Sequence, residues 1–272
     1  MTVKPNSKKL AALYEKYGII VILILEVIFF SIKSPTFLKL DNILLVSRQV
    51  SFYGIAAVGM TMVLLVGEID ISVGSILAFS GCLSAVLITK AAVPVALACL
   101  IAIVISTFFG LLSGTLTTIC KVPSLIATLA MQIIIKGCTY LMTGGTAVSG
   151  LPDNFKFMGQ GFLLGRIPVP VVVWLVIFLL GLFVLNKTYI GRRIYAVGGN
   201  KEAARLSGIK TTGIVIGTFV CSAFVAGISG TLMAARLGSG MASVGSDFAM
   251  DVLTASVLGG VSLQGGKGNA VN

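Results

Sequence analysis

Residues 52–66 read FYGIAAVGMTMVLLV and residues 76–88 read ILAFSGCLSAVLI, with GEIDISVGS between them at 67–75. The two flanking runs are apolar almost throughout, as expected of helices that cross a membrane. The stretch between them carries two carboxylates, Glu68 and Asp70. This alternation decides the fold class, and it raises the question of what the polar stretch does in such surroundings.

The composition predicts an integral membrane protein. Of the 272 residues, 57% are hydrophobic and 11% are charged, and the mean hydropathy is +1.06. A soluble globular chain is about 25% charged. The net charge of +11 fits an excess of Lys and Arg on the cytoplasmic side better than nucleic-acid binding, which we do not expect. The chain has no histidine, which excludes His-ligated metals and Ser-His-Asp triads and weakens any enzyme interpretation.

The apolar runs predict an all-α, polytopic transmembrane bundle that contacts membrane lipid and forms one domain over residues 1–272. Because a span needs about 20 mostly apolar residues, about eight helices are expected. The predicted spans are 17–33, which contains Glu26, 50–67, 72–90, 93–118, 124–143, 168–186, 212–235 and a short one at 247–260.

The basic residues predict the topology. Four lysines precede the first span, and six basic residues lie between 187 and 211. Positive-inside reasoning therefore places the N-terminal tail, residues 1–16, and the 187–211 loop in the cytoplasm, and residues 144–167 on the outer side.

The GEIDISVGS stretch has two interpretations that its spacing does not separate. Gly67 and Gly74 let the backbone leave helical geometry, and either Asp70 or Ser72 can cap the helix that follows. The stretch is then a polar turn between helices. Alternatively it interrupts a membrane helix, so that its polar side chains line a pathway.

Residues 188–210, TYIGRRIYAVGGNKEAARLSGIK, predict a short cytoplasmic helix. Gly198 and Gly199 break the chain, Asn200 is a good N-cap, and Gly208 is placed to end the helix. A helix of about two turns is marginal alone in water, so a groove of another protein is expected to receive it. The alternative is a solvated basic loop that only anchors the topology. The residues of this loop that we expect to matter are Gly198, Gly199, Asn200, Ala203, Ala204, Arg205, Ser207 and Gly208.

Glycines mark two further features. The C-terminal stretch VLGGVSLQGGKGN, residues 257–269, contains the pairs Gly259–Gly260 and Gly265–Gly266. Its register does not match a phosphate-binding loop, since Gly266 stands where that loop needs Lys, and a tight turn is expected instead. Two GxxxG spacings within the predicted spans, Gly110/Gly114 and Gly213/Gly217, predict close helix packing, within the chain or between two copies.

The three glycine-bearing stretches, in this order, resemble the inner-membrane permeases of bacterial ABC monosaccharide importers, the group that includes the ribose permease. They stand here as EIDISVGS, GRRIYAVGGNKEAARLSGI and GGVSLQGGKG, and the similarity extends through SPTFLKLDNIL (34–44), VPSLIATLAM (122–131) and LMAARLGSG (232–240). Three departures stand out. Glu68 replaces a usual Gly, Ala249 replaces a common acid two residues before Asp251, and about two of the family's roughly ten helices, those that close the fold, are expected to be missing.

The resemblance implies a passive permease of the bacterial cytoplasmic membrane that carries ribose or a related sugar. ABC ATPase subunits, with their ATP and Mg, would dock on the 187–211 coupling loop. A periplasmic or extracellular sugar-binding protein and a second permease subunit would complete the importer, with no cofactor held by this chain. The translocation-core motif would be Gly67, Asp70, Ser72, Gly74 and Ser75. The alternative is a secondary transporter in which Glu68 and Asp70 carry protons or sodium.

Overall fold

The computed structural model describes residues 5–271, apart from the side chains of residues 5–17 and 19. The lysines of the predicted cytoplasmic tail therefore lie outside the side chains described. The chain divides into two compact units, Met1–Ser47 and Arg48–Asn272, which are treated separately here. That the whole chain is a single permease domain stays a prediction.

The first unit contains helix α1 (Pro5–Lys33), which includes the predicted span 17–33. From Ile20 to Phe30 the described side chains of this helix are exposed, and most of them are large and apolar. A short turn then leads to Leu40, where helix α2 begins.

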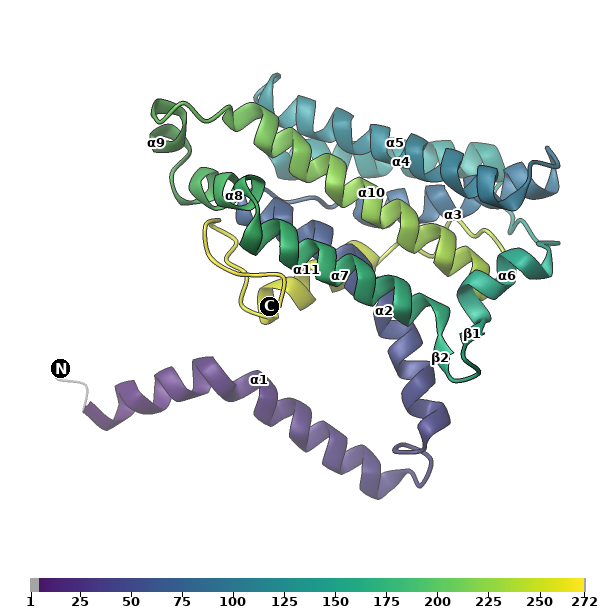
Figure 1. The fold of residues 1–272 in the computed structure, drawn as a ribbon, viewed down its shortest axis with the longest axis horizontal. Helices are drawn as coiled ribbons and strands as arrows, with labels where there is room; N and C mark the ends of the chain where they lie inside the picture. The colour runs from purple at the N-terminus through teal and green to yellow at the C-terminus, as the bar shows by residue number, and fades with distance from the viewer. Residues whose placement is uncertain (1–4, 272) are drawn as a thin grey trace. The chain divides into compact units, whose positions relative to one another are not determined.

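The second unit is helical apart from one small hairpin (Figure 1). Its long helices are α2 (Leu40–Leu65, which starts in the first unit), α3 (Val73–Thr89), α4 (Val95–Thr118), α5 (Ser124–Thr143), α7 (Val169–Lys187) and α10 (Thr211–Leu237). The shorter elements are α6 (Asp153–Gln160), α8 (Tyr189–Gly199), α9 (Lys201–Leu206), α11 (Phe248–Leu258) and the antiparallel strands β1 (Phe162–Leu163) and β2 (Ile167–Pro168).

The all-α prediction is confirmed. Within the described residues five helices, α2, α4, α5, α7 and α10, are long and apolar enough to cross a membrane. Helix α11 differs from the span expected at 247–260. Its 11 residues rise about 16 Å, roughly half of a hydrocarbon core about 30 Å thick. The helix stops there because Gly260 takes a φ of +108°, which does not continue a right-handed helix.

Helix α4 shows how this unit differs from a soluble bundle. Its large side chains Leu100, Val104 and Phe108 are more than half exposed. Its buried face is made of small residues, namely Ala98, Cys99, Ala102, Ser106, Gly110, Ser113, Gly114 and Thr117. This distribution, with large apolar side chains outward and small ones inward, is typical of a helix that faces lipid on one side and packs closely on its neighbours on the other.

The loops of the second unit gather at two opposite ends (Figure 1). Helices α8 and α9 and the C-terminal loop lie at one end, and α6 with the β1–β2 hairpin lies at the other. The 187–211 loop and the 144–167 segment, which the charge pattern predicts on opposite sides of a membrane, are thus at opposite ends of the bundle. Which end is cytoplasmic stays a prediction.

The two GxxxG spacings behave differently. A Cβ placed on Gly110 would overlap the Phe219 carbonyl of α10, and one on Gly114 would come within 2.9 Å of the Ile216 Cα. A Cβ on Gly213 or Gly217 would meet no atom within 4 Å. The first pair brings α4 and α10 into backbone contact, whereas the within-chain packing expected of the second pair does not form. A contact of Gly213 and Gly217 with another copy stays a prediction.

This difference predicts a loss of stability from a Gly→Val substitution at one pair and almost none at the other. Gly110→Val should lower the free energy of unfolding by about 1–3 kcal/mol, because the added methyls overpack the contact of α4 with α10. Gly217→Val changes the same residue type in the same motif on an open face, and should leave the monomer's stability nearly unchanged. Thermal unfolding of the two variants in detergent checks this. Equal midpoints would contradict the packing described here.

Candidate functional site

Asp70 lies inside the helix bundle rather than at its end. Its carboxylate is fully buried and accepts hydrogen bonds from the Ser72 amide (3.1 Å), from the Ser72 hydroxyl and from the Ser222 hydroxyl (3.0 Å). Ser222 is the twelfth residue of the 27-residue helix α10, about 16 Å along it. The polar stretch therefore reaches deep between the helices.

The directions in which α2 and α3 run along α10 explain how Asp70 comes to lie beside Ser222. The Phe52 carbonyl accepts a bond from Ser229 of α10, and further along α2 Gly59 packs on Ser222, so α2 runs antiparallel to α10. On α3, Ser80 donates to the Gly227 carbonyl, which is five residues beyond Ser222, so α3 runs parallel to α10. Residues 66–72 thus connect two antiparallel helices and turn back beside the middle of α10.

The expected cap of α3 does not form. Ser72 occupies the N-cap position, but its side chain makes no capping bond and donates to Asp70 instead. Asp70 is committed in turn to Ser72 and Ser222. The Ser72 side chain therefore does not cap α3. Asp70 accepts from the amide of the N-cap residue Ser72 and from the Ser72 and Ser222 hydroxyls, and from no amide within α3 that the structure describes.

The remaining residues of the motif face a loop on the other side of α3. A Cβ on Gly74 would overlap the Gly245 carbonyl, so the two backbones touch. Ser75 lies beside a cavity of about 10 Å³ that Gln132, Lys136 and Ser246 also line. That volume holds about one water molecule. At this point the described residues leave no room for a larger solute.

Glycines from all three sequence motifs meet at one place, which we call the glycine junction: Gly67, Gly198, Gly265 and Gly266. A Cβ on Gly198 would overlap the Leu65 carbonyl and come within 2.6 Å of the Gly266 nitrogen. A Cβ on Gly265 would lie 2.9 Å from both the Gly198 oxygen and the Gly67 nitrogen. The Gly266 amide donates to the Leu65 carbonyl at 2.9 Å. The end of α2, the end of α8 and the C-terminal loop are therefore in direct main-chain contact.

The C-terminal loop has a second tie to α8. The Tyr195 hydroxyl donates to the Gly268 carbonyl at 2.8 Å. Burial raises the pKa of the Tyr195 phenol above its ordinary value. Gly259, by contrast, follows the last residue of α11, and Gly260 is in the turn after it.

The coupling loop contains two helices where one was expected. Helix α8 precedes α9 and begins at Thr188, whose hydroxyl accepts a bond from the Gly191 amide. Gly198 and Gly199 end this helix rather than lying in open loop. The capping role of Asn200 is confirmed, since its Oδ1 accepts from the Ala203 amide at 2.9 Å. Thr188, a residue type that favours the N-cap position, is the signal in the sequence that indicates α8.

Helix α9 presents an exposed edge. Leu206 is 80% exposed and Ala203 is exposed, while Ala204 is buried against the rest of the chain. Arg205 pairs with Glu202 at 2.9 Å on the outer surface. The Ser207 hydroxyl donates to the Ala203 carbonyl, and Gly208 takes a φ of +82° where the helix has ended. An exposed leucine beside an arginine, on a helix this short, is a surface suited to a partner's groove.

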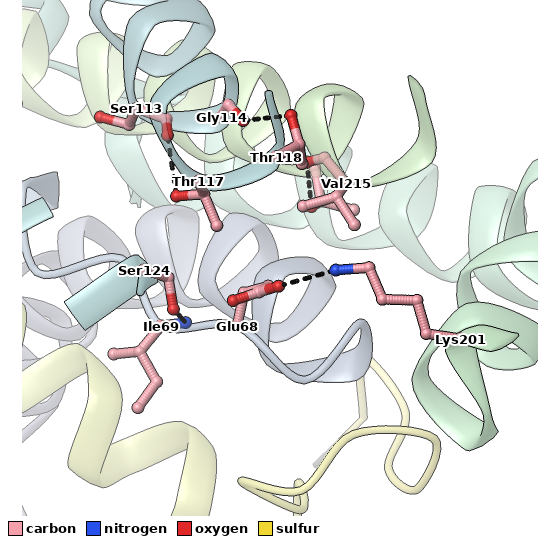
Figure 2. Close-up of polar contacts among 10 residues, drawn as sticks. Glu68, Ile69, Ser113, Gly114, Thr117, Thr118, Ser124, Lys201 and Val215 are labelled. Atoms are coloured by element: carbon pink, nitrogen blue, oxygen red, sulfur yellow. Dashed lines mark hydrogen bonds and ion pairs between the residues drawn. The ribbon is translucent and has the colours of Figure 1, made fainter. Parts of the chain in front are cut away.

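Figure 2 shows the contacts that hold the segment before Asp70. Lys201, the first residue of α9, donates to the Glu68 carboxylate at 3.3 Å. The Ile69 amide donates to the Ser124 hydroxyl at the start of α5. Sequence reasoning singled out Glu68 as a departure but gave it no partner, and it missed Lys201, Ser124 and Ser222 as contacts of this motif.

Comparison with known protein families assigns the chain to one of them. The model of the family described as the branched-chain amino acid transport system / permease component matches residues 42–270. The chain belongs to this permease family. The match includes the whole of the 66–72 connection, the coupling loop and the glycine junction.

Individual relatives cover almost all of this permease. It is 38% identical to the ribose import permease protein of Haemophilus influenzae over 263 residues, which are 95% of this chain and 80% of the relative. It is 40% identical to the Bacillus subtilis ribose import permease protein, over 94% and 80% of the two chains. An L-arabinose ABC transporter permease protein of Azospirillum brasilense is 37% identical, over 93% and 74%. No solved structure matches this permease.

Proposed function

We propose that this permease forms the translocation pathway of an ATP-driven ABC importer for ribose or a related monosaccharide in the bacterial cytoplasmic membrane. The observation that carries the proposal is the 38–40% identity to ribose import permeases along nearly the whole chain. The helices long and apolar enough to cross a membrane fit a multi-pass protein.

The polar groups beside α3 suit a neutral, hydroxyl-rich solute. The small cavity there is lined by buried Ser75, half-buried Gln132 and exposed Lys136 and Ser246. A few placed polar groups in apolar surroundings are typical of sites for small solutes. The cavity has the volume of one water molecule, so passage of a sugar requires these helices to move apart.

That movement would come from partners. An ABC ATPase would bind at the end formed by α8 and α9, where Leu206 and Arg205 are exposed, and would hold the ATP and Mg. A sugar-binding protein would approach from the opposite end, and a second permease subunit would complete the pathway. No catalytic step is assigned to this chain.

The secondary-transporter alternative receives no support from the two carboxylates. Glu68 is engaged by Lys201, and Asp70 is fully buried with bonds from Ser72 and Ser222. Uptake that proceeds without an ATPase subunit and follows a proton gradient would nevertheless overturn the importer proposal.

The test is a mild-detergent pull-down of the tagged permease from native membranes, combined with uptake of labelled ribose. An ABC ATPase should be recovered with the wild-type chain, and Arg205→Glu should lower its recovery at least about tenfold, because it reverses a charge on the docking surface.

A matched control for this substitution is Lys156→Glu. Like Arg205, Lys156 forms an ion pair with a residue three positions earlier, Asp153 at 3.2 Å, but it lies on α6 at the opposite end. ATPase recovery should be unchanged with this variant. If both variants retain the ATPase equally, or if the wild type recovers none, the proposed docking surface is wrong.

A further inference from the structure

One ion pair of the permease joins segments far apart in the chain. The described residues form three ion pairs, and two of them, Lys156–Asp153 and Arg205–Glu202, lie within a single helical turn. The third joins Lys201 to Glu68 across 133 sequence positions. Of these three ion pairs, it is therefore the one that forms a tertiary contact between distant segments.

The two partners sit on the segments that the proposed mechanism must connect. Lys201 is the first residue of α9, the expected contact of the ATPase, and Glu68 lies two residues before the buried Asp70. The Glu68 side chain is 16% exposed and the Lys201 side chain 49%. The pair is thus partly shielded from water, which weakens its screening by salt.

The backbone around Glu68 is held on both sides. Ahead of it, Gly67 lies in the glycine junction. Behind it, the Ile69 amide donates to Ser124 of α5 at 3.2 Å (Figure 2). The backbone at Glu68 is therefore fixed, whereas its side chain and that of Lys201 can change rotamer. A displacement of α9 larger than these rotamer changes can absorb pulls on a segment whose neighbours are α2, α5 and the Asp70 turn.

We propose that Glu68 and Lys201 are a positioning pair that transmits movement of α9 to the 66–72 connection and so tightens the coupling of ATP hydrolysis to translocation. The inference rests on the proposed function. Glu68 stands where the permeases of ABC monosaccharide importers, which this sequence resembles, usually have Gly. In this chain the ion pair is therefore an addition to the main-chain contacts of the glycine junction.

The experiment uses the permease with its co-purified ATPase and binding protein in lipid vesicles, and measures labelled ribose taken up per ATP hydrolysed. Glu68→Gln and Lys201→Gln should each lower this ratio about two- to fivefold, the range expected when a partly exposed ion pair is lost. ATPase recovery in pull-downs should stay at the wild-type level for Glu68→Gln, whose side chain lies outside α9.

The decisive variant is the exchange Glu68→Lys with Lys201→Glu, which restores an ion pair of reversed polarity. It should return the ratio to within about twofold of the wild type, which would show that the two side chains act as a pair. A midpoint of thermal unfolding that is unchanged in the single variants separates this role from a loss of stability. Lys121→Gln is the matched control. Lys121 is exposed in the α4–α5 turn and forms no ion pair within the described part of the chain, so its loss of charge should leave the ratio unchanged.

Single variants that match the wild type, or an exchange no better than the single variants, would overturn the inference. A wild-type assembly that hydrolyses ATP without moving ribose would contradict the proposed function instead. In that case the hydrolysis rate decides the inference: a rate altered in the single variants and restored in the exchange supports it, and an unaltered rate overturns it.

Discussion

Gly198→Ala is expected to lower the permease's free energy of unfolding by about 2–3 kcal/mol, although alanine is the better helix former. Gly198 lies in α8, where helix propensity alone predicts a gain of about 1 kcal/mol from the substitution. The added Cβ, however, would overlap the Leu65 carbonyl and approach the Gly266 nitrogen to 2.6 Å. Both are backbone atoms, which cannot rotate away as a side chain could.

The neighbouring residue supplies the control. A Cβ on Gly199 would meet no atom within 4 Å, so Gly199→Ala should change stability by only a few tenths of a kcal/mol. Thermal unfolding of both variants in detergent, together with their yields from membranes, compares one methyl group at two adjacent positions. A Gly198→Ala variant as stable as Gly199→Ala would show that the glycine junction is not closed as described.

The second large effect is expected at Asp70. Asp70→Ala should cost about 3 kcal/mol of stability, because it leaves the Ser72 amide and the Ser222 hydroxyl buried without their acceptor and opens a small cavity. Asp70→Asn should retain most of the stability. Its amide oxygen can accept the bonds from Ser72, and the Ser222 hydroxyl can turn to accept from the amide nitrogen.

Denaturation of the two variants in detergent, followed by the midpoint of unfolding, measures the difference. Ser222→Ala tests the same contact from α10 and should cost less than Asp70→Ala, since the Asp70 carboxylate keeps its bonds from Ser72. If Asp70→Ala unfolds at the same temperature as Asp70→Asn, the buried hydrogen bonds do not hold the 66–72 connection in place.

Local signals in the sequence predicted local structure well. Hydropathy indicated the membrane helices, and Asn200 indicated its own capping bond because a cap depends on residues two or three positions away. Helix α8 was missed although Thr188 gave a signal of the same kind. The glycines at its end were interpreted as a break in the chain, whereas they permit close contact with Leu65 and Gly266.

Contacts between distant segments could not be predicted in the same way. The bond from Ser222 to Asp70 spans 152 positions and the Lys201–Glu68 pair spans 133, and one sequence carries no mark of either. The two GxxxG spacings illustrate the limit. They are identical as patterns, yet only Gly110 and Gly114 face a neighbouring backbone, because the neighbours are set by the arrangement of the whole bundle.

The glycine junction has a mechanical consequence. Where segments contact each other through side chains, rotamer changes absorb small displacements, so one segment can shift slightly without moving the other. Here Gly198 and Gly265 contribute no side chain, so the end of α2, the end of α8 and the C-terminal loop touch as bare peptide planes. Backbone-to-backbone contacts of this kind cannot adjust by rotamer changes. A sub-ångström displacement of α8 must therefore either move all three segments together or separate them. This suits an all-or-none conformational change better than a graded one.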